Sequence, residues 1–291
     1  MKKSKGELIF SIVNKLVLGI IALVTLYPFV YVLSASISNG EAVAAGQVLL
    51  LPKNINFSAY GKVMEFRGLW VAYGNTIFYA VVGTATCMFF SVTGAYALSK
   101  HRLMGRKFFT IMVTLTMWFK AGTVPEFLNF RSLGLYNTRA VPIIGFAIVA
   151  FNVIILKTYF ESVPESLEES ASIDGANDLR ILASIYLPLS KAGLATVALF
   201  YAISKWNGFF WSMILLRDEN KVPLQVLLRK MIIEMNATSE FSDAVEMARL
   251  GYSVETVVYA TIIISIIPMV VVYPFVQKYF TKGTMVGAVK G

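Results

Sequence analysis

Long apolar stretches recur along the whole chain. A membrane-crossing helix needs roughly 20 mostly apolar residues to cover about 30 Å of hydrocarbon. Six stretches meet this length, at about 16–37, 75–98, 108–130, 140–160, 190–216 and 255–279. Each is continuous rather than alternating, which disfavours the strands of a membrane barrel. The pattern predicts an all-α polytopic membrane protein with six transmembrane helices and both termini on one side.

Two of the six stretches carry a lysine near the middle, Lys120 in the third and Lys205 in the fifth. An ammonium at bilayer depth costs about 3 kcal/mol on insertion scales, so each is expected to face a cavity, a partner or a carboxylate. Glu126 can pair with Lys120 only if Gly122 and Pro125 break the helix. Such a pair, or snorkelling of Lys120 to the membrane surface, explains this lysine as well as a polar path does. Lys205 has no acid nearby in the sequence and is expected to face a polar path.

The hydrophobic content is 57% and the formal net charge is +9. The charge is not a nucleic-acid signal, because the basic residues gather at stretch ends: before the first, after the second within 99–107, and after the sixth. With six spans these clusters share one side, and the positive-inside tendency makes that side cytoplasmic. The N terminus, the 99–107 turn, the 161–189 loop and the tail at 280–291 are then cytoplasmic. The loops at about 38–74, 131–139 and 217–254 face outward.

Reactive side chains are few. With one histidine, His101, and one cysteine, Cys87, a zinc site with nitrogen and sulfur ligands is implausible. No G-x-x-x-x-G-K-[ST] loop is present, so a P-loop nucleotide site is not expected. The basic start resembles a signal peptide, but its apolar run exceeds the roughly 7–15 residues of a signal h-region and indicates an uncleaved first span. We expect one membrane domain over 1–291, no metal or cofactor in this chain, and no enzyme activity.

Acidic residues concentrate in one loop. Six of the seventeen acids lie within residues 161–178. Ser162 is expected to cap a first short helix, Gly175 to end it with a positive φ, and Asn177 or Asp178 to begin a second one. Pro188 is expected to break the chain before the fifth stretch. One apolar face of the second helix is expected to contain Leu179, Leu182, Ala183 and Tyr186.

The acidic hairpin is too short to bury its own apolar side chains. It could rest on the membrane surface, but surface helices are usually basic and the inner leaflet is anionic. Acidic and small residues fit better in a groove on another protein. We therefore expect the acids of this hairpin to face a partner protein.

The same loop resembles the signature of permease subunits of bacterial ATP-binding-cassette importers, which reads E-A-A, three residues, G, nine residues, I-x-L-P. Both spacings are kept here, and Ser170 replaces the middle alanine. The resemblance implies that coupling helices at about 162–188 dock on an ATPase subunit. The residues that it assigns to this contact are Glu169, Ser170, Ala171, Asp174, Gly175, Ala176, Ile185, Leu187 and Pro188.

Other segments resemble carbohydrate-importer permeases, specifically the smaller permease of maltose-type systems. They are GAYALSKHRLMGRK at 94–107, SLGLYNT at 132–138, KWNGFF at 205–210 and KGTMVGAVKG at 282–291. VPEFLNFRSLGLYNT, at 124–138, looks closest to the complex-oligosaccharide subgroup. The resemblance implies a type I importer permease fold in the bacterial cell membrane. It also implies that the transporter moves a carbohydrate into the cytoplasm, and the subgroup implies that this carbohydrate is an oligosaccharide.

The resemblance also implies partners. These are a second homologous permease, two ATP-binding subunits that hold ATP and Mg, and an external sugar-binding protein, which contacts the outward loop at about 217–254. It further places Gly287, Lys290 and Gly291 of the tail at the ATPase. The alternative is a self-sufficient secondary carrier or membrane-bound enzyme, but the sequence shows neither intramembrane coupling-ion residues nor a polar catalytic cluster.

The fifth stretch groups residues that suit a sugar path. Trp206 and Asn207 follow Lys205, and an aromatic face stacks on sugar C–H groups while an amide bonds to hydroxyls. Core packing explains Trp206 equally well. On a regular helix Lys205 and Asn207 lie about 200° apart, so a break at Gly208 is needed for both to line one cavity. Related permeases often have Gly-His in place of Ser204-Lys205, a departure that hints at an acidic or charge-bearing sugar.

Overall fold

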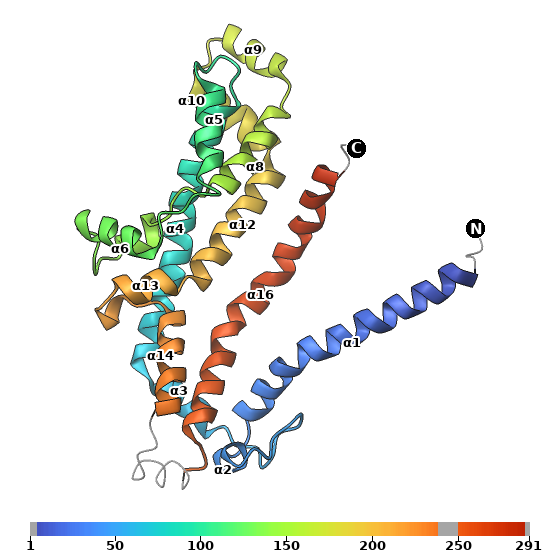
Figure 1. The fold of residues 1–291 in the computed structure, drawn as a ribbon, viewed down its shortest axis with the longest axis vertical. Helices are drawn as coiled ribbons and strands as arrows, with labels where there is room; N and C mark the ends of the chain where they lie inside the picture. The colour runs from blue at the N-terminus through green and yellow to red at the C-terminus, as the bar shows by residue number, and fades with distance from the viewer. Residues whose placement is uncertain (1–4, 238–249, 289–291) are drawn as a thin grey trace. The chain divides into compact units, whose positions relative to one another are not determined.

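A computed structural model describes residues 5–237 and 250–288 of the chain (Figure 1). Every regular element in these two ranges is a helix, as the apolar runs predict, and they contain no β-strand. The chain divides into two compact units, which we describe separately. The first is formed within Met1–Leu69 and Leu228–Pro268, and the second within Trp70–Leu227 and Met269–Gly291.

The first unit is built around a long apolar helix. Helix α1 (Lys5–Ser36) presents apolar side chains outward along most of its candidate span, Gly6–Ser36, in which only the last three residues, Ser34, Ala35 and Ser36, are buried. Its end packs on the start of α16 (Val254–Ala288), where the Tyr31 and Tyr259 ring centroids are 5.8 Å apart. Two short helices follow α1 in the chain, α2 (Gly40–Ala44) and α3 (Ser58–Glu65).

The second unit contains the buried core. Helix α8 (Ala150–Glu161) packs against α5 (Arg106–Leu115) and α12 (Lys191–Asn207), and α4 (Arg67–Ser99) contributes Ala95, Tyr96 and Leu98 to the same core. Gly193 allows the close approach of α8 and α12, because a Cβ there would overlap the ring of Tyr159. Figure 1 shows these helices running alongside one another.

The predicted spans differ in continuity. The first, second and sixth stretches form long helices, and the candidate spans among the described residues are Gly6–Ser36, Arg67–Ser99 and Val254–Val271. A fourth is reached if the bent pair Asp178–Leu189 and Lys191–Asn207, which meet at 88°, counts as one span.

The third, fourth and fifth stretches are each interrupted. The third stops at Leu115 and resumes as α6 (Thr123–Ser132) after Gly122, whose φ is 92°. The fourth is split into α7 (Ala140–Ile144) and α8, with Phe146 at a φ of 56° between them. The fifth breaks at Gly208, and α13 (Phe210–Leu215) follows. Hydropathy alone does not detect such breaks, because they depend on backbone dihedrals at single residues.

Candidate functional site

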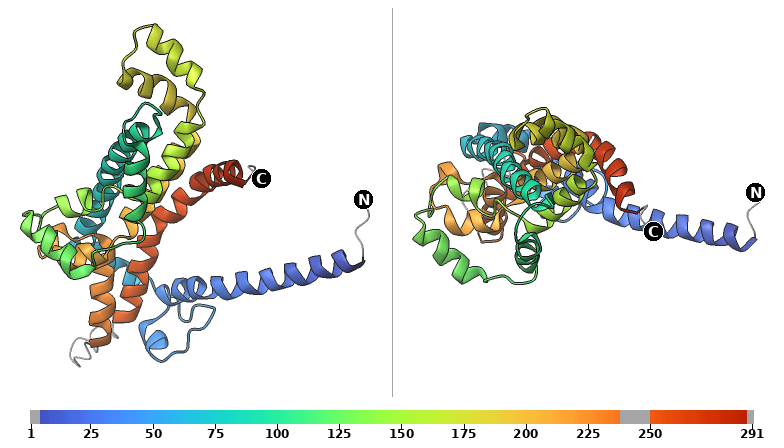
Figure 2. Two further views of the ribbon diagram at one scale, coloured as in Figure 1. Left: turned by 45° about the horizontal axis from the view of Figure 1, so that its top comes forward. Right: turned by 90° about the horizontal axis from the view of Figure 1, so that it is seen from above.

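The acidic loop forms two helices joined at a glycine. Helix α9 (Glu165–Ile173) ends before Gly175, whose φ of 78° is the expected left-handed conformation. The Asn177 side chain accepts a hydrogen bond from the amide of Arg180 at 2.9 Å and begins α10 (Asp178–Ile181). In both views of Figure 2 the yellow-green α9 lies beside the helix that follows it.

One detail of the predicted hairpin is wrong and another is shifted by two residues. Ser162 does not cap α9; it ends α8, where its hydroxyl donates to the carbonyl of Tyr159 at 2.7 Å, and Pro164 takes the N-cap position. The break expected at Pro188 falls at Ser190 instead: the helix continues through a π-helical turn, η1 (Leu182–Tyr186), into α11 (Leu187–Leu189), and the chain then bends by 88° before α12. A proline ring clashes with the carbonyl four residues earlier, and in this chain that carbonyl lies within the wider π turn.

The π turn also changes which apolar side chains are buried. Ile181, Leu182 and Tyr186 are 2%, 7% and 3% exposed, whereas Leu179 is 74% exposed and Ala183 is also exposed. The expected apolar face was therefore wrong for Leu179 and Ala183. Ala183 lies within the π turn, which has more residues per turn than an α-helix, so a face counted with 3.6-residue spacing misses its register.

A lysine after α4 is bound to the hairpin. The Lys100 ammonium lies 2.5 Å from Oε2 of Glu168, and the Tyr186 hydroxyl donates to the same oxygen at 2.6 Å. The ammonium also lies 4.0 Å from the ring centroid of Tyr96 and 3.8 Å from that of Tyr186. The side chains of Lys100 and Glu168 are only 8% and 16% exposed, so this is a shielded ion pair.

Burial lowers the pKa of Lys100 below its ordinary value, because a shielded site disfavours the ammonium, and Glu168 opposes this shift. For Glu168, burial by itself would raise the pKa. Hydrogen bonds from Lys100 and Tyr186 outweigh that effect and hold the pKa of the carboxyl below its ordinary value. The Glu168 carboxylate is therefore charged at neutral pH, and its charge favours the ammonium beside it.

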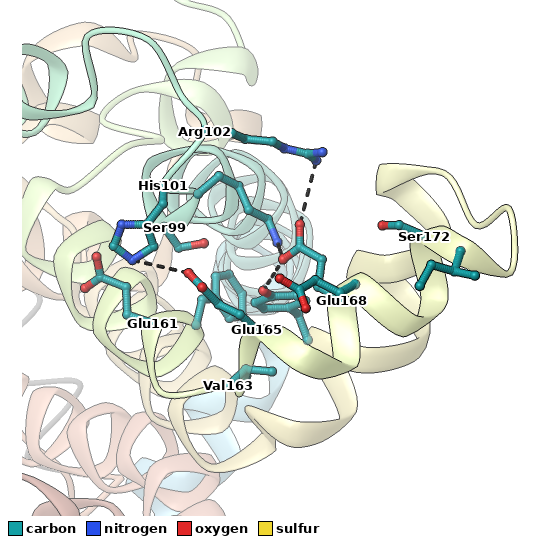
Figure 3. Close-up of a pocket in the computed structure, with 13 residues that line it drawn as sticks. Ser99, His101, Arg102, Glu161, Val163, Glu165, Glu168 and Ser172 are labelled. Atoms are coloured by element: carbon teal, nitrogen blue, oxygen red, sulfur yellow. Dashed lines mark hydrogen bonds and ion pairs between the residues drawn. The ribbon is translucent and has the colours of Figure 1, made fainter.

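Further ion pairs tie the hairpin region to the basic turn at 99–107. Glu168 also lies 3.8 Å from Arg102, and His101 lies 3.5 Å from Glu165, as the dashed lines in Figure 3 show. The remaining pairs are Arg102 with Asp178, Arg106 with Glu161, and Lys157 with Glu161. A pocket of about 570 Å³ lies between the turn and α9, and the acidic and basic residues that line it are Lys100, His101, Arg102, Glu161, Glu165, Glu168 and Glu169.

Four of the six acids in 161–178 thus pair with the chain's own basic residues, and the expectation that the whole cluster faces a partner was too broad. Glu169 and Asp174 are exposed, and neither has an ion pair among the described residues. The turn and the acidic loop were both placed on one side from the sequence, but their pairing was missed. The opposite charges of the basic turn and the acidic loop could have indicated this pairing from the sequence.

The other residues of the permease signature are either exposed or packed against the core. Ser170, Gly175 and Pro188 are exposed. Four partly buried apolar side chains pack against the core of the second unit: Ala171, Ala176, Ile185 and Leu187.

Lys205 binds the broken fourth stretch. Its ammonium donates hydrogen bonds to the carbonyls of Pro142, Ile143 and Gly145 at 2.9, 3.3 and 3.0 Å. These carbonyls lie at the C-terminal end of α7, where unpaired backbone acceptors and the helix dipole both favour a cation. Three hydrogen bonds match the number of donors on the ammonium, and the Cys87 side chain also lies within hydrogen-bonding reach of Lys205.

The neighbours of Lys205 differ in their surroundings. Trp206 is 8% exposed and packs edge-on against Tyr73, with ring centroids 6.1 Å apart. Asn207 is exposed and lines the same pocket of about 290 Å³ as Lys205, because α12 ends at Asn207 and the chain turns at Gly208. This is the break that both residues need to share a cavity.

Two aromatic residues at this pocket were missed by the sequence analysis. Phe146 and Trp211 line it, with ring centroids 5.5 Å apart. Trp211 was overlooked because it lies beyond the Gly208 break, and Phe146 because its positive φ cannot be read from residue type. Lys120 lies elsewhere, exposed between α5 and α6, and forms no ion pair with Glu126 in the structure as described.

The remaining predicted sites lie partly outside the described residues. The loop at about 217–254 contains a 3₁₀ turn, η2 (Glu219–Lys221), and helix α14 (Leu224–Ala237), but 238–249 lie outside the description. Gly287 belongs to α16, and the other two tail residues, Lys290 and Gly291, lie outside it.

Comparisons with known proteins give a consistent picture. A polygalacturonan/rhamnogalacturonan transport system permease protein of Bacillus subtilis, YtcP, is 41% identical over 271 residues, covering 93% of this chain and 94% of that protein. The Bacillus subtilis protein LplC is 38% identical over 291 residues, covering 100% and 98%. A chain from the crystal structure of a bacterial ABC transporter involved in the import of the acidic polysaccharide alginate is 53% identical, with a TM-score of 0.90 and coverage of 96% and 99%.

A family profile described as binding-protein-dependent transport system inner membrane component matches residues 9–286. The match covers nearly the whole chain, so the family predicted from the loop signature is confirmed. The alternative of a self-sufficient carrier or enzyme is not favoured by these relatives. The chain belongs to the family of binding-protein-dependent transport system inner membrane components, the multi-pass permease subunits of ATP-binding-cassette importers.

Proposed function

We propose that this permease works in the bacterial cell membrane with a second homologous permease, two ATP-binding subunits and an external sugar-binding protein. This proposal rests on the hairpin, which holds the signature residues in two helices and leaves Glu169 and Asp174 exposed. Neither acid has an ion pair within 5–237 and 250–288. These two acids contact the ATP-binding subunit, and the four packed apolar residues fix the hairpin's position. ATP and Mg are held by that subunit, and its hydrolysis of ATP drives uptake. The tail residues Gly287, Lys290 and Gly291 add to the same contact.

We propose six crossings with both termini in the cytoplasm. The two ends of α4 support this sidedness. At its C-terminal end, the 99–107 turn pairs with the acidic loop. Near its N-terminal end, Asn75 donates to the carbonyl of Val222 and Tyr79 to that of Lys221, both in the loop assigned to the outside. Segments assigned to the same side thus meet at the same end of one long helix.

The substrate that we propose is an acidic oligosaccharide. Two relatives support this class: the 41% identical protein is a polygalacturonan/rhamnogalacturonan transport permease, and the 53% identical chain comes from a transporter involved in the import of the acidic polysaccharide alginate. Within this chain, Lys205 and Asn207 line the path, and Phe146 and Trp211 offer ring faces for sugar C–H groups. Lys120 stays a predicted path residue outside this pocket, whereas Trp206, packed on Tyr73, has a supporting role.

Reconstitution of the complete importer in proteoliposomes tests this function. We expect ATP-dependent uptake of labelled oligogalacturonate or alginate oligosaccharide, and little uptake of the neutral control maltotriose. Vesicles that lack the ATP-binding subunits serve as the second control. Uptake in those vesicles would support the self-sufficient carrier, and equal uptake of maltotriose would overturn the acidic substrate class.

A further inference from the structure

Lys100 joins three separate elements through a single carboxylate. It directly follows α4, Glu168 lies on α9, and Tyr186 ends the π turn of the second hairpin helix. The same oxygen of Glu168 receives Lys100 at 2.5 Å and the Tyr186 hydroxyl at 2.6 Å. The two tyrosine rings on the ammonium restrict its movement further.

Adjacent acids on α9 face in different directions. Glu169 is exposed and has no ion pair in the described structure, whereas Glu168 is shielded and bound to Lys100. Successive residues on an α-helix lie about 100° apart, so one acid can meet a partner while the next meets α4. A displacement of α9 by a bound partner would therefore act directly on the end of α4.

Stability alone is a weak explanation of this arrangement. Replacing a buried ion pair by apolar residues of similar volume is often neutral or stabilising, whereas removing one partner is costly because the other charge stays unpaired. The pair does fix the relative position of the elements that it joins, since its geometry is narrow and the charges are shielded from solvent.

We propose that Lys100 is a positioning residue for energy coupling: with Glu168 and Tyr186 it forms a rigid link that passes movement of α9 to the end of α4. This inference rests on the proposed docking of the hairpin on an ATP-binding subunit. The link transmits force only while both charges are present. Loss of the link leaves the hairpin docked on the ATP-binding subunit, but ATP hydrolysis then no longer drives sugar transport.

The test uses the complete importer in proteoliposomes and measures three quantities: copurified ATP-binding subunit, ATP hydrolysis stimulated by the loaded binding protein, and sugar imported per ATP. The variants are Lys100→Met, Lys100→Arg and the double variant Lys100→Met with Glu168→Met. Lys107→Met is the matched control, because Lys107 is an exposed lysine of the same turn and has no ion pair in the described structure.

We expect Lys100→Met and the double variant to keep the ATP-binding subunit and its hydrolysis but to import at least about fivefold less sugar per ATP, the lower end of usual coupling effects. Lys100→Arg should recover most of the ratio, and Lys107→Met should match the wild type. The double variant is decisive, because it leaves no unpaired charge. A wild-type ratio in that variant would show that the pair is only structural and overturn the link.

The proposed docking is tested separately by the wild type. If the wild-type permease fails to copurify with the ATP-binding subunit, the proposed function fails, and the link with it. If the wild type copurifies but the double variant loses the subunit, Lys100 serves docking itself and the inference about coupling is overturned.

Discussion

Lys205→Met removes the only donor recorded, among the described residues, for the carbonyls of Pro142, Ile143 and Gly145. A hydrogen bond from a charged group contributes about 1.5–3 kcal/mol, and an unsatisfied buried acceptor costs about 1–3 kcal/mol. The three bonds share one ammonium with its own desolvation cost, and water can enter the pocket beside it. We therefore expect a net loss of about 2–3 kcal/mol rather than the sum.

The assay is thermal unfolding of the purified importer in detergent, without sugar, followed by the loss of its monodisperse chromatographic peak. We expect Lys205→Met to lower the apparent Tm by roughly 5–10 °C, taking the slope of soluble domains of about 150–250 residues as a scale. Lys205→Arg keeps a donor for the carbonyls and should lose less. Lys191→Met is the matched control, since Lys191 is exposed on the same helix and has no ion pair in the described structure.

An unchanged Tm for Lys205→Met would refute this reasoning. The Lys205→Cys variant in a Cys87→Ser background distinguishes two roles for position 205, exposure to a water-filled path and support of the broken span. Reaction of that thiol with a small polar reagent would show that position 205 faces a water-filled path, as the sequence predicts. A lowered Tm with an unreactive thiol would instead identify Lys205 as a support for the broken span.

Three further changes test the hairpin and the core. Gly175→Val places a branched residue at a φ of 78°, which costs about 1–2 kcal/mol, so sugar-stimulated ATP hydrolysis and uptake should fall while membrane insertion persists; normal uptake would contradict it. Glu169→Lys reverses an exposed charge and should reduce copurified ATP-binding subunit, and full recovery would exclude this contact. Gly193→Leu overlaps the ring of Tyr159 and should lower stability by about 1–3 kcal/mol in thermal unfolding, unlike Gly74→Ala, whose added Cβ meets nothing within 4 Å.

Local signals in the sequence were sufficient to predict the hairpin. Gly175 and Asn177 act through their own backbone conformation or side chain, so residue type and spacing identify them. The π turn could not be predicted in this way, because it depends on how Pro188 is accommodated in a helix packed on the core. The family signature records the residues of this turn but not its geometry.

Contacts between distant segments were beyond the sequence analysis. The partner of Glu168 lies 68 residues earlier, and the carbonyls that bind Lys205 lie about 60 residues earlier. The cost of an intramembrane charge correctly indicated that Lys205 needs a polar environment. It could not indicate that backbone carbonyls, rather than water or a carboxylate, provide that environment, because their availability follows from the break after α7.

The interrupted third, fourth and fifth stretches have a consequence for how lipid surrounds this subunit. Hydrocarbon cannot hydrate the amides and carbonyls that a broken helix exposes, so such segments need protein or water around them. Lys205 meets part of this need at the break after α7. Helix α1 is different, since its span is unbroken and is buried only at its last three residues, 34–36. Acyl-chain photolabels should therefore react with residues 6–33 and spare 145–149, and this contrast would map the lipid boundary of the permease.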